Sequence, residues 1–141
     1  MNTPQQSANI APGLFWAFAS PIGRMSREPY WLCFLSLTLI FAIPLRIWIL
    51  SSPVPPEPEA LIAGDYLSSN PLFPIVYFIT HWFILAILIK RLQDLGQSGF
   101  FALLVFVPLL DIIMVIALGL LPSQAVPNRH GPLPNSYWRR R

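Results

Sequence analysis

Two ionisable side chains lie halfway along long apolar stretches of the sequence. His81 lies halfway along the run 71–89, and Asp111 lies halfway along the run 100–121. If the two runs are antiparallel membrane helices, both side chains reach a similar depth near the membrane centre and can pair. Such a pair can sense protons or contact an ion, because histidine titrates near neutral pH. A structural pair that only joins two helices is the favoured alternative, since one pair makes a poor conduit.

A second set of polar residues follows the run 71–89. Lys90 and Arg91 come first, and Asp94 lies four positions after Lys90, which is the spacing of a helical ion pair. Gly96 and Gly99 then predict the end of the helix and a turn of the chain. This segment indicates either a docking site for a lipid head group or a protein partner, or a turn that only fixes topology.

The sequence contains no assembled catalytic set. It has no Gly-rich phosphate loop, no pair of histidines at zinc-ligand spacing and no Gly-x-Ser-x-Gly turn. Ser26 has cationic neighbours but no histidine nearby in sequence to act as its base. The single cysteine, Cys33, cannot form an internal disulfide or a cysteine-rich metal site. We therefore predict a protein that is not an enzyme and has no metal or other cofactor.

The elements that position these residues are three apolar runs, 30–50, 71–89 and 100–121. Each has about the length that a helix needs to cross a hydrocarbon layer of ~30 Å. Charged residues form 11% of the chain and apolar residues 55%, which excludes an ordinary cytosolic domain. The sequence therefore predicts an all-α, integral membrane bundle of three transmembrane helices.

The runs divide the chain into a disordered tail over 1–13, a membrane domain over 14–134 and a basic tail over 135–141. Bulky apolar residues around Trp16 predict a short N-terminal helix. That helix either lies along the membrane interface or packs as a lid over the ends of the spans.

The distribution of charge predicts an orientation in the membrane. Basic residues precede the first run and follow the second, and only acidic residues lie between the two runs. By the positive-inside rule the N-terminus and the loop after the second run are cytoplasmic. The basic residues concerned are Arg24, Arg27, Lys90 and Arg91.

The third run conflicts with this rule, because a single crossing would place the basic C-terminal tail outside. We nevertheless prefer the single crossing, since the apolar residues of the run outweigh the cost of burying Asp111. In the alternative, Pro108 and Asp111 break the run into two half-helices that enter and leave on the same side.

Three polar motifs flank the apolar runs. Residues 23–31 read GRMSREPYW, residues 91–101 read RLQDLGQSGFF, and residues 127–132 read PNRHGP. In order and spacing they resemble the domain-of-unknown-function 805 family of small bacterial inner-membrane proteins, over about residues 15–134. The resemblance implies a helical fold in the cytoplasmic membrane and transfers no activity. It also singles out a polar cluster of Arg24, Arg27, Arg91, Asp94, Gly96, Gly99, Asn128 and Arg129, to which Lys90 is adjacent.

Some positions depart from the family pattern. Pro29 stands where the family usually has glutamate, Gln93 replaces a histidine and Gln97 replaces an arginine. Asp111 falls where the family often has glycine, and His81 is not a family feature. These last two differences weaken the hypothesis of a proton or ion conduit.

The expected function is that of an interaction or structural protein of the bacterial inner membrane. Its cytoplasmic polar cluster binds lipid head groups or a protein partner, which includes a second copy of the chain. A nucleic-acid partner is not expected, because the chain has no basic helix with interleaved aromatic residues. The alternative is a small transport or channel component that uses His81 and Asp111.

Overall fold

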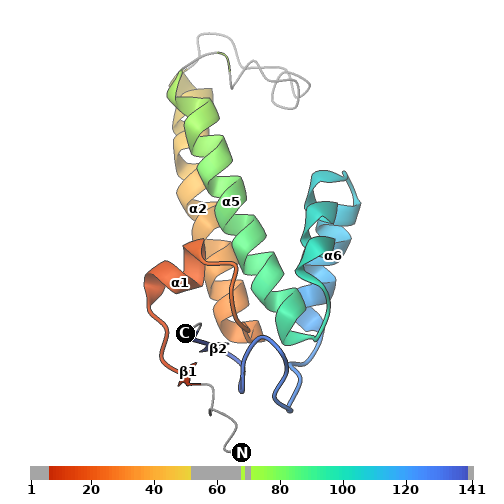
Figure 1. Ribbon diagram of the computed structural model, residues 1–141. Helices are drawn as coiled ribbons and strands as arrows, with labels where there is room; N and C mark the ends of the chain where they lie inside the picture. Colours follow the sequence, from red (N-terminus) through yellow and green to blue (C-terminus); the bar gives the residue numbers. More distant parts are fainter. Residues whose placement is uncertain (1–6, 52–67, 69–70, 140–141) are drawn as a thin grey trace, which may run out of the picture.

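The protein is described by a computed structural model over residues 7–51, 68 and 71–139. Within these residues the chain is mainly helical, and Figure 1 shows two long helices side by side with a shorter helical hairpin beside them. The elements in chain order are β1 (Ala8–Asn9), α1 (Leu14–Ala19), α2 (Arg27–Ser51), α5 (Leu72–Asp94), the 3-10 helix η1 (Gly99–Phe106), α6 (Leu110–Leu120) and β2 (Tyr137–Trp138).

Helices α2 and α5 are, within the described residues, the ones long and apolar enough to cross a membrane. Only 12% and 17% of the residues in their most apolar 18-residue windows are buried. Leu32 on α2 and Phe78 on α5, for example, are 68% and 70% exposed. These helices therefore present apolar side chains outward, unlike the core helices of a water-soluble domain.

The packed core lies at one end of the helix pair. The buried residues of α5 all fall between Ala86 and Asp94, close to its C-terminus. From α2 the core receives Tyr30, Cys33 and Leu37, which lie near its N-terminus. The elements α1, η1 and α6 all pack against this end, whereas the halves of α2 and α5 farther from it contribute little to the core.

Helix α5 extends past the apolar run 71–89 and includes Lys90, Arg91 and Asp94. Gly96, with φ of 74°, ends it as the sequence predicts, since glycine adopts this left-handed conformation without strain. The Gln97 and Gly96 amides donate to the Leu92 and Gln93 carbonyls, which is the hydrogen-bond pattern of a Schellman motif.

The expectation of one continuous helix over 100–121 is wrong. Proline disfavours the helical conformation in the residue before it, and Val107, which precedes Pro108, is extended with φ of −101° and ψ of 113°. Leu109 then adopts φ of 70°, and α6 begins at Leu110. The break is therefore at Pro108, and Asp111 lies in the first turn of the second helix, where a carboxylate favours helix formation.

Because of this break, η1 and α6 form a hairpin that returns to the end of the molecule from which it started (Figure 1). Two hydrogen bonds fix α6 against α2. The Tyr30 hydroxyl donates to the Val115 carbonyl at 3.0 Å, and the Trp31 indole donates to the Gly119 carbonyl at 3.2 Å.

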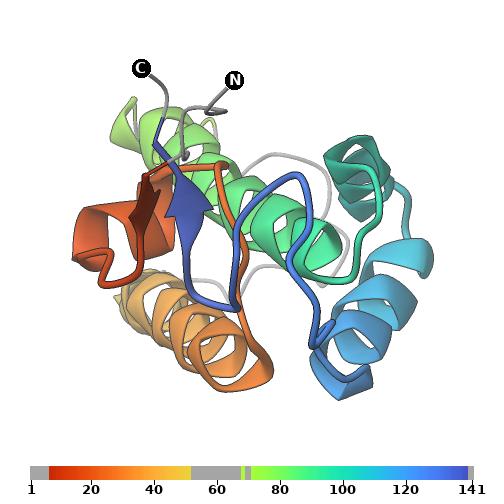
Figure 2. The ribbon, with the colours of Figure 1, turned by 60° about the horizontal axis from the view of Figure 1, so that its bottom comes forward.

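The two terminal segments meet at the same end of the molecule. Figure 2 shows β1 and β2 together over the ends of the helices, and they pair as an antiparallel sheet with Ala8 opposite Trp138. The tail expected to be disordered over 1–13 thus forms a strand within its described part, while residues 1–6 lie outside the description. The expected basic tail over 135–141 likewise includes β2.

Candidate functional site

The side chains of Arg24, Lys90, Arg91 and Asp94 form a group at the core end of the molecule, which we call the ionic junction. All four are 0% exposed. Arg91 and Asp94 lie one turn apart on α5, and Arg24 comes from the extended segment before α2. Asp94 Oδ1 accepts from Arg24 Nε at 3.0 Å, and Asp94 Oδ2 accepts from Arg91 Nη1 at 2.5 Å.

The spacing of Lys90 and Asp94 in the sequence indicated a helical ion pair between these two residues. The structure has Asp94 pair with two arginines and not with Lys90. On a helix the side chains three positions apart also face each other, which explains the pairing with Arg91.

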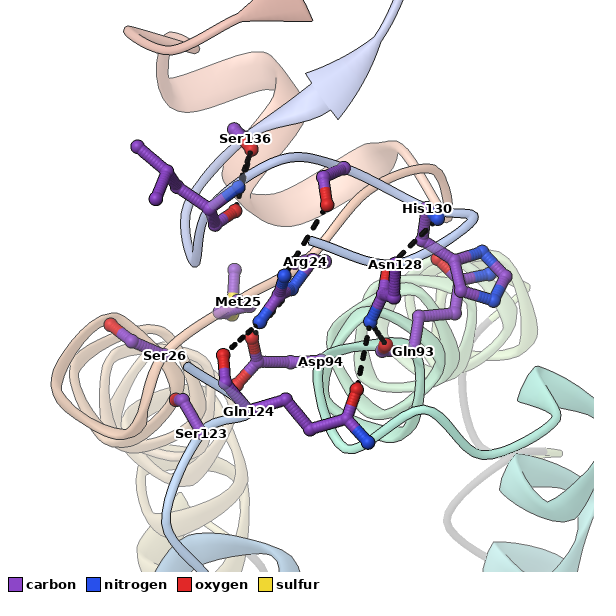
Figure 3. A network of polar contacts seen from close by, with 12 residues as sticks. Arg24, Met25, Ser26, Gln93, Asp94, Ser123, Gln124, Asn128, His130 and Ser136 are labelled. Carbon is purple, nitrogen blue, oxygen red and sulfur yellow. Dashed lines mark hydrogen bonds and ion pairs between the residues drawn. The ribbon is translucent and has the colours of Figure 1, made fainter. Parts of the chain in front are cut away.

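Arg24 connects the junction to the C-terminal segment (Figure 3). Its Nη1 donates to the carbonyls of Val126 at 2.8 Å and Gly131 at 3.3 Å, and its Nη2 donates to the carbonyl of Gln124. The Arg24 amide donates to the Ser136 carbonyl at 2.9 Å. One guanidinium therefore organises a segment that contains no long helix or strand of its own.

Arg91 connects the junction to the end of α6. Its Nε donates to the Leu118 carbonyl at 2.7 Å, and its Nη2 donates to the Leu121 carbonyl. The last carbonyls of a helix have no partner within the helix and carry a partial negative charge. A buried cation at this position therefore holds the returning end of the hairpin against α5.

Lys90 holds α1 against α5 in the same way, by donating to backbone carbonyls. Its Nζ donates to the carbonyls of Trp16 at 2.5 Å and Ala17 at 2.7 Å, and it lies 4.7 Å from the centre of the Trp16 ring. Helix α1 thus packs as a lid over the end of α5, although its Leu14 and Phe15 side chains are exposed.

The junction contains three cations and one carboxylate, so backbone carbonyls must supply the remaining negative partial charge. Each cation donates to at least two carbonyls, as described above. Close by, burial and the charges of Arg129 and Arg24 lower the pKa of His130. His130 Nε2 is accordingly an acceptor for Arg129 Nε at 3.0 Å.

Asn128 holds the PNRHGP motif beside the junction. Its Nδ2 donates to the Gln93 carbonyl at 2.9 Å, and its Oδ1 accepts from the His130 amide at 2.9 Å (Figure 3). A Cβ on Gly131 would lie 2.8 Å from the Ser136 carbonyl oxygen, which explains a glycine at this turn. The PNRHGP motif is thus hydrogen-bonded to both other motifs, through Asn128 to the Gln93 carbonyl and through the Gly131 carbonyl to Arg24.

The remaining predicted residues of the cluster lie outside the junction. Arg27 and Arg129 are exposed. A Cβ on Gly96 would meet the Gln124 side chain at 2.5 Å, and one on Gly99 would meet Ile89 at 2.8 Å, so both glycines allow close packing.

His81 and Asp111 line one cavity but are not bonded to each other. His81 Nδ1 lies 2.8 Å from the Tyr77 carbonyl oxygen, and Asp111 Oδ1 accepts from the Ile112 amide at 2.7 Å. In the part of the chain that the structure describes, the ion pairs are those of Asp94. The structure therefore places both residues on the wall of one cavity, without the expected direct pairing.

Sequence reasoning missed several partners in this region. Gln124 and Ser136 contribute carbonyls to Arg24, and the Ser26 hydroxyl and amide bond the Asn135 side chain at 2.9 Å each. A usable signal was the share of amide and hydroxyl side chains among residues 123–136, five of 14, which is higher than in the apolar runs. The carbonyl partners could not be recognised from the sequence, because every residue type has a backbone carbonyl.

The comparison with known families agrees with this geometry. A model described as "Protein of unknown function (DUF805)" matches residues 18–132, a stretch that contains all four residues of the ionic junction. The chain belongs to the DUF805 family. No curated protein and no solved structure matched the chain. For this DUF805 protein, function must therefore be argued from the site itself.

Proposed function

We propose that this chain is a non-enzymatic, multi-pass protein of the bacterial cytoplasmic membrane whose cytoplasmic end is an interaction surface. Helices α2 and α5 cross the bilayer, and the η1–α6 hairpin enters from the cytoplasmic face and returns to it. The outward-facing apolar side chains of these elements, such as Ile113 at 62% exposure, support lipid contact.

The hairpin removes the conflict with the positive-inside rule. Because α6 returns to the end where η1 begins, the segment after α6 lies beside Arg24, which donates to the Gly131 and Ser136 carbonyls, and this segment carries Arg129 and Arg139. With that end in the cytoplasm, every basic residue named here obeys the rule. At the turn between η1 and α6, Val107 and Leu109 are 44% and 73% exposed, and non-helical backbone at membrane depth requires a cover of protein or water.

The observation that carries the proposal is the ionic junction. Its charges are buried and bonded within the protein, so they build the cytoplasmic end and are not free to bind a ligand. The exposed arginines Arg27, Arg129 and Arg139 remain available on the surface that this junction supports. Anionic lipid head groups or an acidic partner surface suit such residues.

Two measurements test this proposal. A fluorescent protein fused after Arg141 should fluoresce, and a phosphatase inserted between Ser51 and Ser68 should be active, because the first reporter requires the cytoplasm and the second the outside. A silent C-terminal fluorescent reporter with an active C-terminal phosphatase would contradict the hairpin topology.

The second measurement compares the protein with a variant in which Arg27, Arg129 and Arg139 are alanine. If the surface binds lipid, phosphatidylglycerol should raise the thermal stability of the purified protein more than that of the variant. If it binds a protein, crosslinking in membranes should recover a partner that the variant loses. If neither readout distinguishes the two proteins, the interaction surface is wrong.

A second candidate function is transport of a proton or a small ion, favoured by the presence of His81 and Asp111 on the wall of one cavity. Its test is flux into vesicles that contain the purified protein. Flux that His81→Ala and Asp111→Ala leave unchanged would eliminate this candidate.

A further inference from the structure

A cavity of about 350 Å³ lies between α2, α5 and the η1–α6 hairpin. Its wall is apolar, with Phe34, Ile84 and Ile116 among the lining residues, except for His81 and Asp111. Ligand sites in proteins typically measure ~300–1,000 Å³ and combine an apolar wall with a few polar groups. The cavity has both properties.

The polar groups of the cavity wall are hydrogen-bond acceptors. The Tyr77 carbonyl can only accept, so His81 Nδ1 carries the proton in the 2.8 Å contact between them. In the neutral ring His81 Nε2 is then an acceptor. Asp111 uses Oδ1 for the Ile112 amide, and within the described residues its Oδ2 has no partner. The complementary ligand group is therefore a donor.

Aromatic rings lie against the His81 ring, and one aromatic residue lines the cavity itself. The His81 ring stacks on Phe106 with centroids 6.2 Å apart, and its centroid lies 3.8 Å from that of Tyr77. Phe34 lines the cavity from α2. The faces of aromatic rings attract cations, most strongly where water is excluded.

Acceptors, a carboxylate and aromatic faces in an apolar cavity fit one kind of ligand. We infer that the cavity binds a small amphipathic cation, a protonated amine whose apolar part fills the space between the helices. This inference does not rest on the interaction surface of the cytoplasmic end. It also does not require transport, because binding without flux would leave it intact.

The experiment measures binding of tritiated n-octylammonium to the full-length protein in phosphatidylcholine nanodiscs, with empty nanodiscs as the blank. Binding should be saturable, with octanol a weaker competitor than unlabelled octylammonium and octanoate without effect. Asp111→Asn should weaken binding about tenfold or more, as expected when a charge-assisted hydrogen bond is lost. The matched control is Glu28→Gln, which neutralises an exposed carboxylate outside the cavity and should leave the affinity unchanged.

A second variant tests the cavity independently of its charge. Ile116→Trp adds bulk at a wall residue that is 48% exposed, so it should block binding while the protein remains monodisperse. Equal binding of octanol and octylammonium, an Asp111→Asn variant with unchanged affinity, or the absence of saturable binding would each overturn the inference.

Discussion

Arg24 Nε lies 3.0 Å from Asp94 Oδ1 although the two residues are 70 positions apart, and both side chains are completely buried. Asp94 also bonds Arg91, and within the described residues it is the one buried carboxylate. Removing it leaves two buried guanidinium groups without an anionic partner.

Asp94→Ala should therefore destabilise the protein by about 3–5 kcal/mol, the cost of breaking a buried ion pair on one side. Its accumulation in membranes and its thermal stability in detergent should fall sharply, with Asp94→Asn intermediate because the amide retains one acceptor oxygen. Glu28→Ala, at an exposed carboxylate, is the control. Normal accumulation of Asp94→Ala would show that the junction is not essential.

Gly119 permits the close approach of α6 to α2. A Cβ at this position would overlap the Trp31 ring, so Gly119→Ala should displace the hairpin and lower the thermal stability. Gly119→Ala combined with Trp31→Phe should recover part of the loss, because the smaller ring makes room. Gly13→Ala, where a Cβ meets nothing within 4 Å, should not be destabilising, and equal effects at both glycines would contradict this explanation.

Gln93 carries a buried side-chain oxygen that has no hydrogen-bond partner among the residues that the structure describes. An unsatisfied buried acceptor costs about 1–3 kcal/mol, so Gln93→Leu should raise the melting temperature in detergent. Gln97→Leu alters an exposed glutamine of the same loop and should not raise it. A lower melting temperature for Gln93→Leu would mean that the oxygen has a partner, such as an ordered water.

The lowered pKa of His130 predicts a pH dependence of stability. The unfolded chain, with a histidine pKa near 6.5, binds a proton more readily than the folded protein. Stability should therefore be fully present above pH 6.5 and decrease as the pH falls below it. His130→Gln keeps an acceptor for Arg129 but does not titrate, so its melting temperature should depend less on pH between 7.5 and 5.5. Identical pH profiles would refute this role.

The sequence predicted the helical class, the two long apolar helices and the end of α5 at Gly96, because apolar run length and glycine are local signals. It located the break in the third run only as an alternative at Pro108 and Asp111. The preferred single helix failed because an energy sum over apolar side chains does not include the backbone restriction that Pro108 imposes on Val107.

The sequence indicated which residues form the ionic junction, but it did not indicate that their side chains are buried. The motifs identified Arg24, Arg91 and Asp94 as members of one cluster, but they were expected to bind lipid or a partner. Their actual partners are largely main-chain carbonyls of the hairpin and the C-terminal segment. Any residue type supplies a carbonyl, so no pattern of side chains can reveal such contacts before the fold is known.

The contact between Arg24 and the Gly131 carbonyl joins positions 107 residues apart, and it has a consequence for biogenesis. While the polypeptide is being made, Arg24 leaves the ribosome long before the carbonyls of Gln124, Val126 and Gly131, which accept its hydrogen bonds. A prematurely terminated product would hold charged groups without partners against the lipid, in a form that membrane proteases and chaperones can recognise. The polar network around buried Arg24 is therefore completed only after residues 124–131 have been translated.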